Sequence, residues 1–410
     1  MGHDATEDKE DGNPRIVDYI VLLIIYISLA ILVVVVMIPI IRINYSIKQL
    51  LFSLFVSENS DKYRNELKKT IYNFFDTNYV VLTSSGRTAI YMLVKTLPQK
   101  KVVIPAYTCE VVEEAVRLAG KQILYAHVSK NTLNICEYPT IDSDTIVIAT
   151  HQYGLPSEIK QLAEVCKEKN AVLIEDCAGS LGSKIDNKLT GTYGDFGVYS
   201  FSASKTLHSP TKGGFIIAKD ENLLISIENK FLFDKDSFSF KVKQIVKGLG
   251  FCLNNYSLFS YLINKTVRKK DNHSSNLEKI DKSTYRRGFY EWQAFVVIKQ
   301  FENLTKIFEK RKEMASKYEN GIKNNLISKP VFCENAVNIR YALLVKERSS
   351  FINYCISKGI QVGKGYKRSI CPDDYVEERE LSNEIVYLPF GNKYSKREIQ
   401  YIISTINEYC

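Results

Sequence analysis

Residues 194–205 have the sequence GDFGVYSFSASK, and a KGG tripeptide follows at 212–214. The run over 197–201 predicts a buried strand, which places Lys205 just after a strand and among small hydroxyl residues. A lysine amine has an ordinary pKa of about 10.4, and burial lowers that pKa toward a nucleophilic amine. Such lysines form Schiff bases with carbonyl compounds. A solvated lysine on a surface loop is the alternative for any single lysine.

Strands and helices alternate on both sides of this block. Short β-branched runs that are apolar on both faces predict a buried and largely parallel sheet. Their alternation with helical stretches predicts an α/β layer fold. The other predicted strands are Tyr79–Leu82, Val102–Pro105, Gln122–His127, Thr145–Thr150, Ala171–Glu175 and Gly214–Ala218, and the predicted helices are Thr88–Thr96, Glu110–Ala119 and Ser157–Lys169.

Two further segments carry chemistry. TSSGRTAI at 83–90 follows a strand and opens a helix, so the N–H groups at Gly86 and Arg87 can cradle an anion. Ser-Ser-Gly is equally compatible with a plain helix cap. VLIEDCA at 172–178 puts Asp176 at the carboxyl end of a buried strand, the edge where open α/β sheets bind ligands. A buried carboxylate needs a facing cation, such as a protonated ring nitrogen, and the alternative is a cap for the next helix.

In this order the segments resemble fold-type-I enzymes that use pyridoxal 5′-phosphate (PLP), and within them the DegT/DnrJ/StrS family of sugar aminotransferases. The similarity covers about residues 75–410. The G-D-x-G-x-x-S-F-x-x-x-K block is its most specific part. The supporting motifs are IPAYT at 104–108, HQYGLP at 151–156, EDCA at 175–178, Gln293-Ala294 and Leu388-Pro389.

The resemblance implies the PLP-dependent transferase fold of type I. This fold has a large domain with a mostly parallel seven-stranded sheet and a small C-terminal α/β domain, and it works as a homodimer with sites at the interface. By the same resemblance Lys205 holds PLP as a Schiff base and Asp176 pairs with the pyridine nitrogen. Ser200 and the backbone at Gly86 and Arg87 are implied phosphate ligands.

Several positions depart from the family. Gly179 stands where Gln or His contacts the cofactor, Cys109 where an aromatic ring stacks on it, and Lys212 where Glu is common. The Arg286-Arg287 pair replaces an asparagine from the neighbouring subunit, and an arginine there, such as Arg286, can still reach the phosphate across the dimer. PLP binding remains expected, and the substrate class is in question.

The implied activity is transamination from an amino acid, typically L-glutamate, to a keto-sugar nucleotide. Related dehydratases carry His in place of Lys205, which argues against dehydration. A PLP-dependent acyl transferase acting on lipid thioesters is an alternative. Gly179 and Cys109 also keep open a membrane-tethered scaffold or sensor without activity. No metal is expected, and no dinucleotide or P-loop motif follows a strand.

Residues 19–41, YIVLLIIYISLAILVVVVMIPII, carry no charge. As a helix they would span about 34 Å, against about 30 Å for the hydrocarbon core of a bilayer. They predict a single transmembrane helix behind an acidic tail at 1–18, with a cleaved signal peptide or a buried helix as alternatives. The distribution of Lys and Arg favours a cytoplasmic body. The location suggests work on surface polysaccharide or lipid-linked glycan.

The rest of the chain divides into three predicted parts. Residues 42–74 form a juxtamembrane linker, in which 45–56 is either a helix along the membrane surface or a plain linker helix. Residues 75–300 form the PLP-binding large domain, whose basic helical insert at 221–285 either covers the core or makes a second membrane contact. Residues 301–410 form the small domain.

Composition excludes other classes. The 410 residues are 45% hydrophobic, which excludes a mostly disordered chain. The net charge of +9 is spread along the chain, which argues against a dedicated nucleic-acid binder. Nine cysteines without a C-x-x-C pair argue against a zinc site or a disulfide framework, so a reducing compartment is expected.

Overall fold

The computed structural model describes residues 37–77, 79–256, 285–366 and 370–410. The acidic tail and most of the predicted transmembrane helix lie outside these ranges. Among the residues that are described, no helix has both the length and the apolar character needed to cross a bilayer.

The large sheet has eight strands in the order β1-β10-β9-β6-β5-β2-β3-β4. Its central strands are parallel, β10 is antiparallel to both neighbours, and β4 is an antiparallel edge strand. The predicted mostly parallel sheet is confirmed, with the short β4 as an eighth strand. The bounds are β1 Val80–Thr83, β2 Lys101–Pro105, β3 Gln122–Val128, β4 Ile135–Glu137, β5 Thr145–Thr150, β6 Val172–Asp176, β9 Phe196–Ser200 and β10 Gly214–Ala218.

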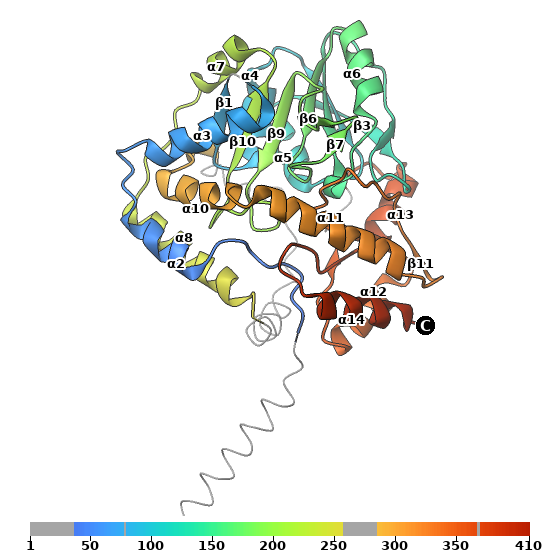
Figure 1. Ribbon diagram of the computed structural model, residues 1–410. Helices are drawn as coiled ribbons and strands as arrows, with labels where there is room; N and C mark the ends of the chain where they lie inside the picture. Colours follow the sequence, from blue (N-terminus) through green and yellow to red (C-terminus); the bar gives the residue numbers. More distant parts are fainter. Residues whose placement is uncertain (1–36, 78, 257–284, 367–369) are drawn as a thin grey trace, which may run out of the picture. The chain divides into compact units, whose positions relative to one another are not determined.

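Both faces of this sheet are covered by helices (Figure 1). Val102 and Ile104 of β2 pack with the helices on one face, whereas Val103 between them packs on the other. Side chains that alternate in this way explain why the strands are apolar at successive positions. The first face carries α4 (Gly86–Thr96) and α5 (Glu110–Ala119), and the second carries α3 (Lys62–Phe75), α6 (Ile159–Glu168) and α10 (Glu291–Phe301).

The C-terminal part has its own antiparallel sheet, in the order β11-β12-β14-β13. Two consecutive helices, α10 and α11, are separated at residues 302–303. A short two-stranded hairpin, β7 (Lys184–Ile185) and β8 (Lys188–Leu189), stands apart from both sheets. The other bounds are α11 Leu304–Gly321, β11 Ile327–Ser328, β12 Tyr341–Val345, α12 Arg348–Ser357, β13 Gly363–Lys364, α13 Val376–Glu384, β14 Ile385–Leu388 and α14 Lys396–Asn407.

The end of the predicted transmembrane helix belongs to this C-terminal core. Residues 37–41 are extended, and Ile38 is buried in the hydrophobic cluster of the small sheet. The Ile38 amide donates to the Gly359 carbonyl at 2.8 Å, and the Gln361 amide donates to the Ile38 carbonyl at 3.0 Å. The prediction of a membrane helix through residue 41 is therefore wrong for its last five residues. An uncharged apolar run suits a protein core as well as a bilayer, so hydropathy alone could not place this boundary.

Two segments outside the sheets pack together on α10. They are α2 (Ile47–Phe52), which continues into the short helix η1 (Ser53–Phe55), and α8 (Phe238–Leu253), which lies beside α2 (Figure 1). Leu50 and Ile245 are buried with Trp292 in one cluster. The inner face of α8 thus covers the core. This is the first of the two interpretations given above for the basic insert. α7 (Glu221–Glu228) precedes α8, and residues 257–284 of the insert lie outside the described ranges.

Candidate active site

The carboxyl ends of neighbouring strands meet at one edge of the large sheet. Thr150 of β5 pairs with Asp176 of β6, and Asp176 pairs with Val198 of β9, two residues before Ser200. Gly214, at the start of the antiparallel β10, pairs with both Thr83 of β1 and Ser200. The register therefore brings the ends of β1, β5, β6 and β9 together.

A cavity of about 200 Å³ opens at this edge. Its wall comes from the strand ends, the loop after β9, the start of α4 and two segments of the C-terminal part. Five of the six predicted site residues line it: Lys205, Asp176, Ser200, Gly86 and Arg87.

Asp176 is the last residue of β6 and is 5% exposed. Its Oδ1 accepts a hydrogen bond from the Ala178 amide at 3.0 Å. Burial raises the pKa of the Asp176 carboxyl, while the ammonium of Lys205 and the Ala178 amide oppose that shift. The carboxyl is thus arranged to face a cation in the cavity.

Lys205 lies in the loop after β9. The Ser209 amide donates to the Phe201 carbonyl at 2.7 Å, and the Lys205 amide donates to the Ser202 carbonyl at 3.0 Å, so the loop turns back on the strand. Burial lowers the pKa of the Lys205 amine, and the carboxylate of Asp176 opposes this shift. An amine of lowered pKa beside a buried carboxyl can act both as a nucleophile and as a proton carrier.

The buried side chains of Gln293 and His208 donate hydrogen bonds to this loop. The Gln293 amide donates to the Thr211 hydroxyl at 2.7 Å and to the Lys212 carbonyl at 2.9 Å. The His208 Nε2 donates to the Lys205 carbonyl at 2.6 Å, because its Nδ1 accepts from the Asn44 amide at 2.9 Å. The Q-A signature therefore supports the loop that carries the lysine.

The start of α4 forms the opposite end of the cavity. The Ser85 hydroxyl caps the helix by accepting from the Thr88 amide, and the first helical residue is Gly86. A Cβ at Gly86 would lie 3.2 Å from the Ser200 Cβ. The glycine thus leaves open a space between a helix N-terminus and a hydroxyl group, where an anion is favoured.

Arg87 contributes to this end through its backbone. Its Nη1 pairs with Glu114 at 2.8 Å, and Glu114 also accepts from the Tyr285 hydroxyl at 2.9 Å. The guanidinium is therefore engaged by Glu114, and binding of an anion by the backbone at Arg87 stays a prediction.

Arg286 does not lie at the cavity. Its side chain is 73% exposed and pairs with Asp234 at 3.2 Å. Within the described part of this chain, Arg286 is not brought to the other predicted site residues. Its proposed reach across a dimer remains a prediction.

Sequence reasoning missed the wall of the cavity that lies opposite the large sheet. Arg340 and Tyr366 come from the C-terminal part, and Gln152 and Tyr153 come from the turn after β5. Tyr153 has a left-handed backbone, with φ of 56°, which is uncommon outside glycine and recurs at functional sites. That HQYG turn was noted only as a family motif, and nothing local in the sequence marks Arg340.

Three of the four departures from the family, Gly179, Cys109 and Lys212, line the cavity. A Cβ at Gly179 would lie 3.3 Å from Ile339 Cδ1 and 3.4 Å from the Gly154 nitrogen, so a larger side chain would have to displace its neighbours. Cys109 lines the wall at the start of α5, and burial raises the pKa of its thiol.

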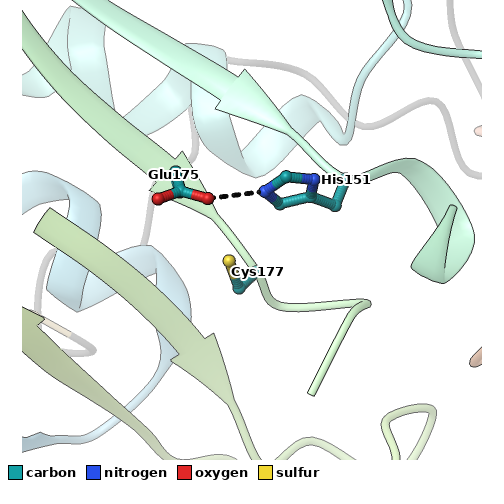
Figure 2. Close-up of side chains that lie close together, drawn as sticks. All are labelled: His151, Glu175 and Cys177. Atoms are coloured by element: carbon teal, nitrogen blue, oxygen red, sulfur yellow. Dashed lines mark hydrogen bonds and ion pairs between the residues drawn. The ribbon is translucent and has the colours of Figure 1, made fainter. Parts of the chain in front are cut away.

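One side-chain N, O or S atom of each of His151, Glu175 and Cys177 lies within 4.8 Å of the others (Figure 2), and His151 also lines the cavity. The His151 Nδ1 accepts from the Ser157 amide at 3.0 Å, so its Nε2 carries the proton and donates to Glu175 at 2.9 Å. Both Glu175 oxygens also accept backbone N–H groups, and burial keeps the Cys177 thiol protonated by raising its pKa. With its lone pairs engaged in this way, the cluster supports the strand ends and does not suit a metal ion.

The comparisons with known proteins agree with this geometry. The profile of the DegT/DnrJ/EryC1/StrS aminotransferase family matches residues 45–407. The chain is 23% identical over 206 residues to GDP-perosamine synthase of Escherichia coli O157:H7, which covers 45% of this chain and 56% of that protein. It is 31% identical over 157 residues to dTDP-4-dehydro-2,3,6-trideoxy-D-glucose 4-aminotransferase of Saccharopolyspora spinosa, or 36% of this chain and 40% of that protein. The chain thus spans about half the length of these curated relatives.

Among solved structures, Spr1654 of Streptococcus pneumoniae, described as a sugar aminotransferase and solved in its PLP form, superposes with a TM-score of 0.68. The identity is 17%, and the match covers 90% of this chain and 98% of that one. At this identity the match shows a shared fold and confirms the predicted fold class.

Proposed function

Because the chain belongs to the DegT/DnrJ/EryC1/StrS aminotransferase family, we propose that it is a PLP-dependent aminotransferase that moves an amino group from L-glutamate to a keto-sugar nucleotide. The observation that carries the proposal is the single cavity that joins Lys205, Asp176 and the start of α4. A scaffold or sensor would not need a buried amine and a buried carboxyl facing one space.

The residues of the cavity fit PLP. The open space at Gly86, between a helix N-terminus and the Ser200 hydroxyl, suits a phosphate. The buried carboxyl of Asp176 suits the protonated nitrogen of a pyridine ring. The Lys205 amine, which lines the same cavity, suits an aldehyde. Three chemically different groups are thus present on one cavity wall.

When bound, PLP supplies an aldehyde that takes up the amino group and a ring that accepts the electrons released at the donor carbon. Lys205 Nζ, once free, takes the proton from that carbon and returns a proton at a neighbouring one. Asp176 holds a proton at the ring nitrogen. The backbone of Gly86 and Arg87 and the Ser200 hydroxyl would hold the phosphate and so would fix the orientation of the cofactor in the cavity.

Borohydride reduction of the purified chain with PLP tests the covalent attachment. A peptide map is expected to show the cofactor on Lys205 and not on Lys212, which lines the same cavity. L-glutamate is expected to remove the visible absorption band of bound PLP, and a keto-sugar nucleotide is expected to restore it. A modified Lys212, or a band that no amino acid removes, would contradict the proposal.

We further propose that the enzyme is a homodimer in which Arg286 reaches the partner's site. The Arg286 side chain is exposed and pairs with the partly exposed Asp234. A side chain at the surface supports such a role, because it can contact a second subunit. Sedimentation would report the oligomeric state, and Arg286→Ala is expected to weaken PLP binding. A monomer that binds PLP with full affinity would contradict this part of the proposal.

We also propose that residues 19–36 anchor the protein in a membrane, with the body on the cytoplasmic side and glycan assembly as its setting. Eighteen uncharged residues remain once 37–41 are assigned to the body, and they would span about 27 Å as a helix. Leu29→Lys with Leu32→Lys places two charges in this run. Each charge raises the free energy of membrane insertion by about 2.5–3.5 kcal/mol. The double variant is expected to leave the membrane fraction, whereas Leu29→Val with Leu32→Val is expected to remain there.

The outer face of α2 and η1 supports this location. Leu51, Phe52 and Phe55 are 44%, 55% and 83% exposed, and Lys48 stands beside them without an acidic residue on either helix. Apolar side chains with lysine on one helix face are typical of an interfacial helix. If Phe55→Glu leaves binding to anionic vesicles unchanged, residues 45–56 are a plain linker.

A further inference from the structure

One wall of the cavity carries buried N–H groups that no acceptor among the described residues satisfies. The Nε of Arg340 and the Nε2 of Gln152 are both buried and have no hydrogen-bond partner in the part of the chain that the structure describes. Gln152 is 1% exposed, and both residues line the cavity that contains Lys205. A buried donor without a partner costs free energy, and such groups in a cavity indicate a missing acceptor.

We propose that Arg340 and Gln152 bind the carboxylate of the amino-acid donor. This inference rests on the proposed aminotransferase function and names the group that recognises one of its two substrates. Arg340 binds the amino acid through its positive charge. The uncharged side-chain amide of Gln152 donates a second hydrogen bond to the same carboxylate.

The surroundings of Arg340 keep its charge available. The guanidinium carbon lies 3.9 Å from the Tyr387 ring centroid and 5.9 Å from that of Tyr153. Aromatic faces stabilise a cation without using its N–H groups, so the hydrogen-bonding edge stays free for an anion. Tyr366 donates to the Gln152 Oε1 at 3.1 Å, which orients the amide.

Position distinguishes this anion from the phosphate of PLP. The phosphate space is at Gly86, on the large domain, whereas Arg340 directly precedes β12 of the C-terminal part. Arg340 and Lys205 line the same cavity of about 200 Å³, so a ligand anion at Arg340 lies in the cavity that Lys205 lines. Burial lowers the pKa of the Lys205 amine, Asp176 opposes that shift, and the charge of Arg340 adds a smaller lowering.

Substrate chemistry selects the amino acid. Its carboxylate is bonded to the carbon that carries the amino group, so it must lie beside Lys205 when that carbon reacts. A keto-sugar nucleotide carries its charge on the diphosphate, which ring atoms separate from the keto carbon. A cation beside Lys205 thus serves the amino-acid half of the reaction.

Stopped-flow measurement of the half-reaction of the PLP-loaded full chain with L-glutamate tests the inference. Arg340→Met keeps a long side chain over Tyr387 and removes the charge. We expect its rate constant per molar L-glutamate to fall by about 10- to 150-fold, which is the usual range for one charge-assisted hydrogen bond. Gln152→Glu places a carboxylate in the pocket and is expected to have a similar effect. Arg379→Met, at an exposed arginine paired with Asp373, is the matched control and should leave the rate unchanged.

A second measurement does not need the reaction. Phenylglyoxal modifies arginine, and peptide mapping of the PLP-free chain reports the modification of Arg340. Glutarate is expected to slow it, whereas the uncharged glutaramide is not.

The possible outcomes separate the two proposals. Wild-type chain that binds PLP but does not react with L-glutamate would overturn the proposed function, and glutarate protection would still support the subsite. Wild-type reaction with an unchanged rate in Arg340→Met, or no protection by glutarate, would overturn the inference and leave the aminotransferase intact. A lower melting temperature with an unchanged rate per molar glutamate would assign Arg340 a structural role only and would also overturn it.

Discussion

Glu175 offers a direct test of how the site is supported. Its side chain is fully buried, one residue before Asp176. Oε1 accepts from the amides of Tyr193 and Gly194, both at 2.6 Å. Oε2 accepts from the Gly191 amide at 2.7 Å and from His151 at 2.9 Å. Although burial opposes it, these hydrogen bonds hold the pKa of the Glu175 carboxyl below its ordinary value.

Glu175→Gln keeps the shape of the side chain and replaces one oxygen by an NH₂ group. Whichever way the amide turns, its NH₂ group then faces two N–H groups that need an acceptor, so two hydrogen bonds are lost. Each hydrogen bond to a charged group contributes about 1.5–3 kcal/mol, which predicts a loss of about 3–6 kcal/mol. Domains are stable by about 5–15 kcal/mol, so the variant is expected to fold with a much reduced margin.

Urea unfolding followed by fluorescence of Trp292, the single and fully buried tryptophan, measures the free energy of unfolding. Glu168→Gln, at an exposed position near the end of α6, is the control and is expected to change it by less than about 0.5 kcal/mol. A loss below about 1 kcal/mol in Glu175→Gln would show that the four contacts do not support the fold as argued. A loss of stability on adding EDTA to the wild type would instead indicate a metal at His151, Glu175 and Cys177.

Three further changes test the cavity itself. Asp176→Asn is expected to slow amino transfer by at least about 100-fold while PLP stays bound. The rate at which L-glutamate removes the absorption band of bound PLP measures the transfer, and the height of that band before L-glutamate is added measures PLP binding. Gly86→Val fills the space beside Ser200 and is expected to weaken binding of PLP far more than binding of pyridoxal, which lacks the phosphate; equal losses would place the phosphate elsewhere. Burial lowers the pKa of His208 to about 3, so between pH 6.5 and 5 only the unfolded chain takes up its proton, and stability should fall by about 2 kcal/mol. His208→Gln should remove that part of the pH dependence in urea titrations, and an unchanged slope would show that His208 titrates normally.

The part of the site on the large domain was predictable because its geometry is local. Asp176 and Ser200 each follow or end a strand, and Gly86 opens the helix after another. In a parallel sheet such strand ends share one edge, so their order along the chain is enough to bring them together. The short, partly exposed β4 escaped prediction because three residues without a buried face give no periodic signal.

The opposite wall was not predictable, because it depends on packing between distant segments. Arg340 stands in an ordinary stretch before a strand, and the sequence does not show that its charge is buried against Tyr387. The same limit applies to Arg286, which family position placed near the phosphate and which the fold of one chain leaves at the surface. Motifs indicate what adjoins a strand end, whereas long-range contacts decide which side chains complete a cavity.

The segment expected to be a juxtamembrane linker gives another example of such long-range contacts, at the loop that carries Lys205. The Asn44 amide donates to His208 Nδ1, which leaves Nε2 as the donor to the Lys205 carbonyl. The Asn44 side chain also donates to the Thr206 carbonyl at 3.0 Å. Two hydrogen bonds therefore tie residue 44 to the loop that carries Lys205, and the low pKa of His208 keeps the ring neutral, as this arrangement requires. The chain between the apolar run and the large domain thus helps to support the candidate active site through Asn44.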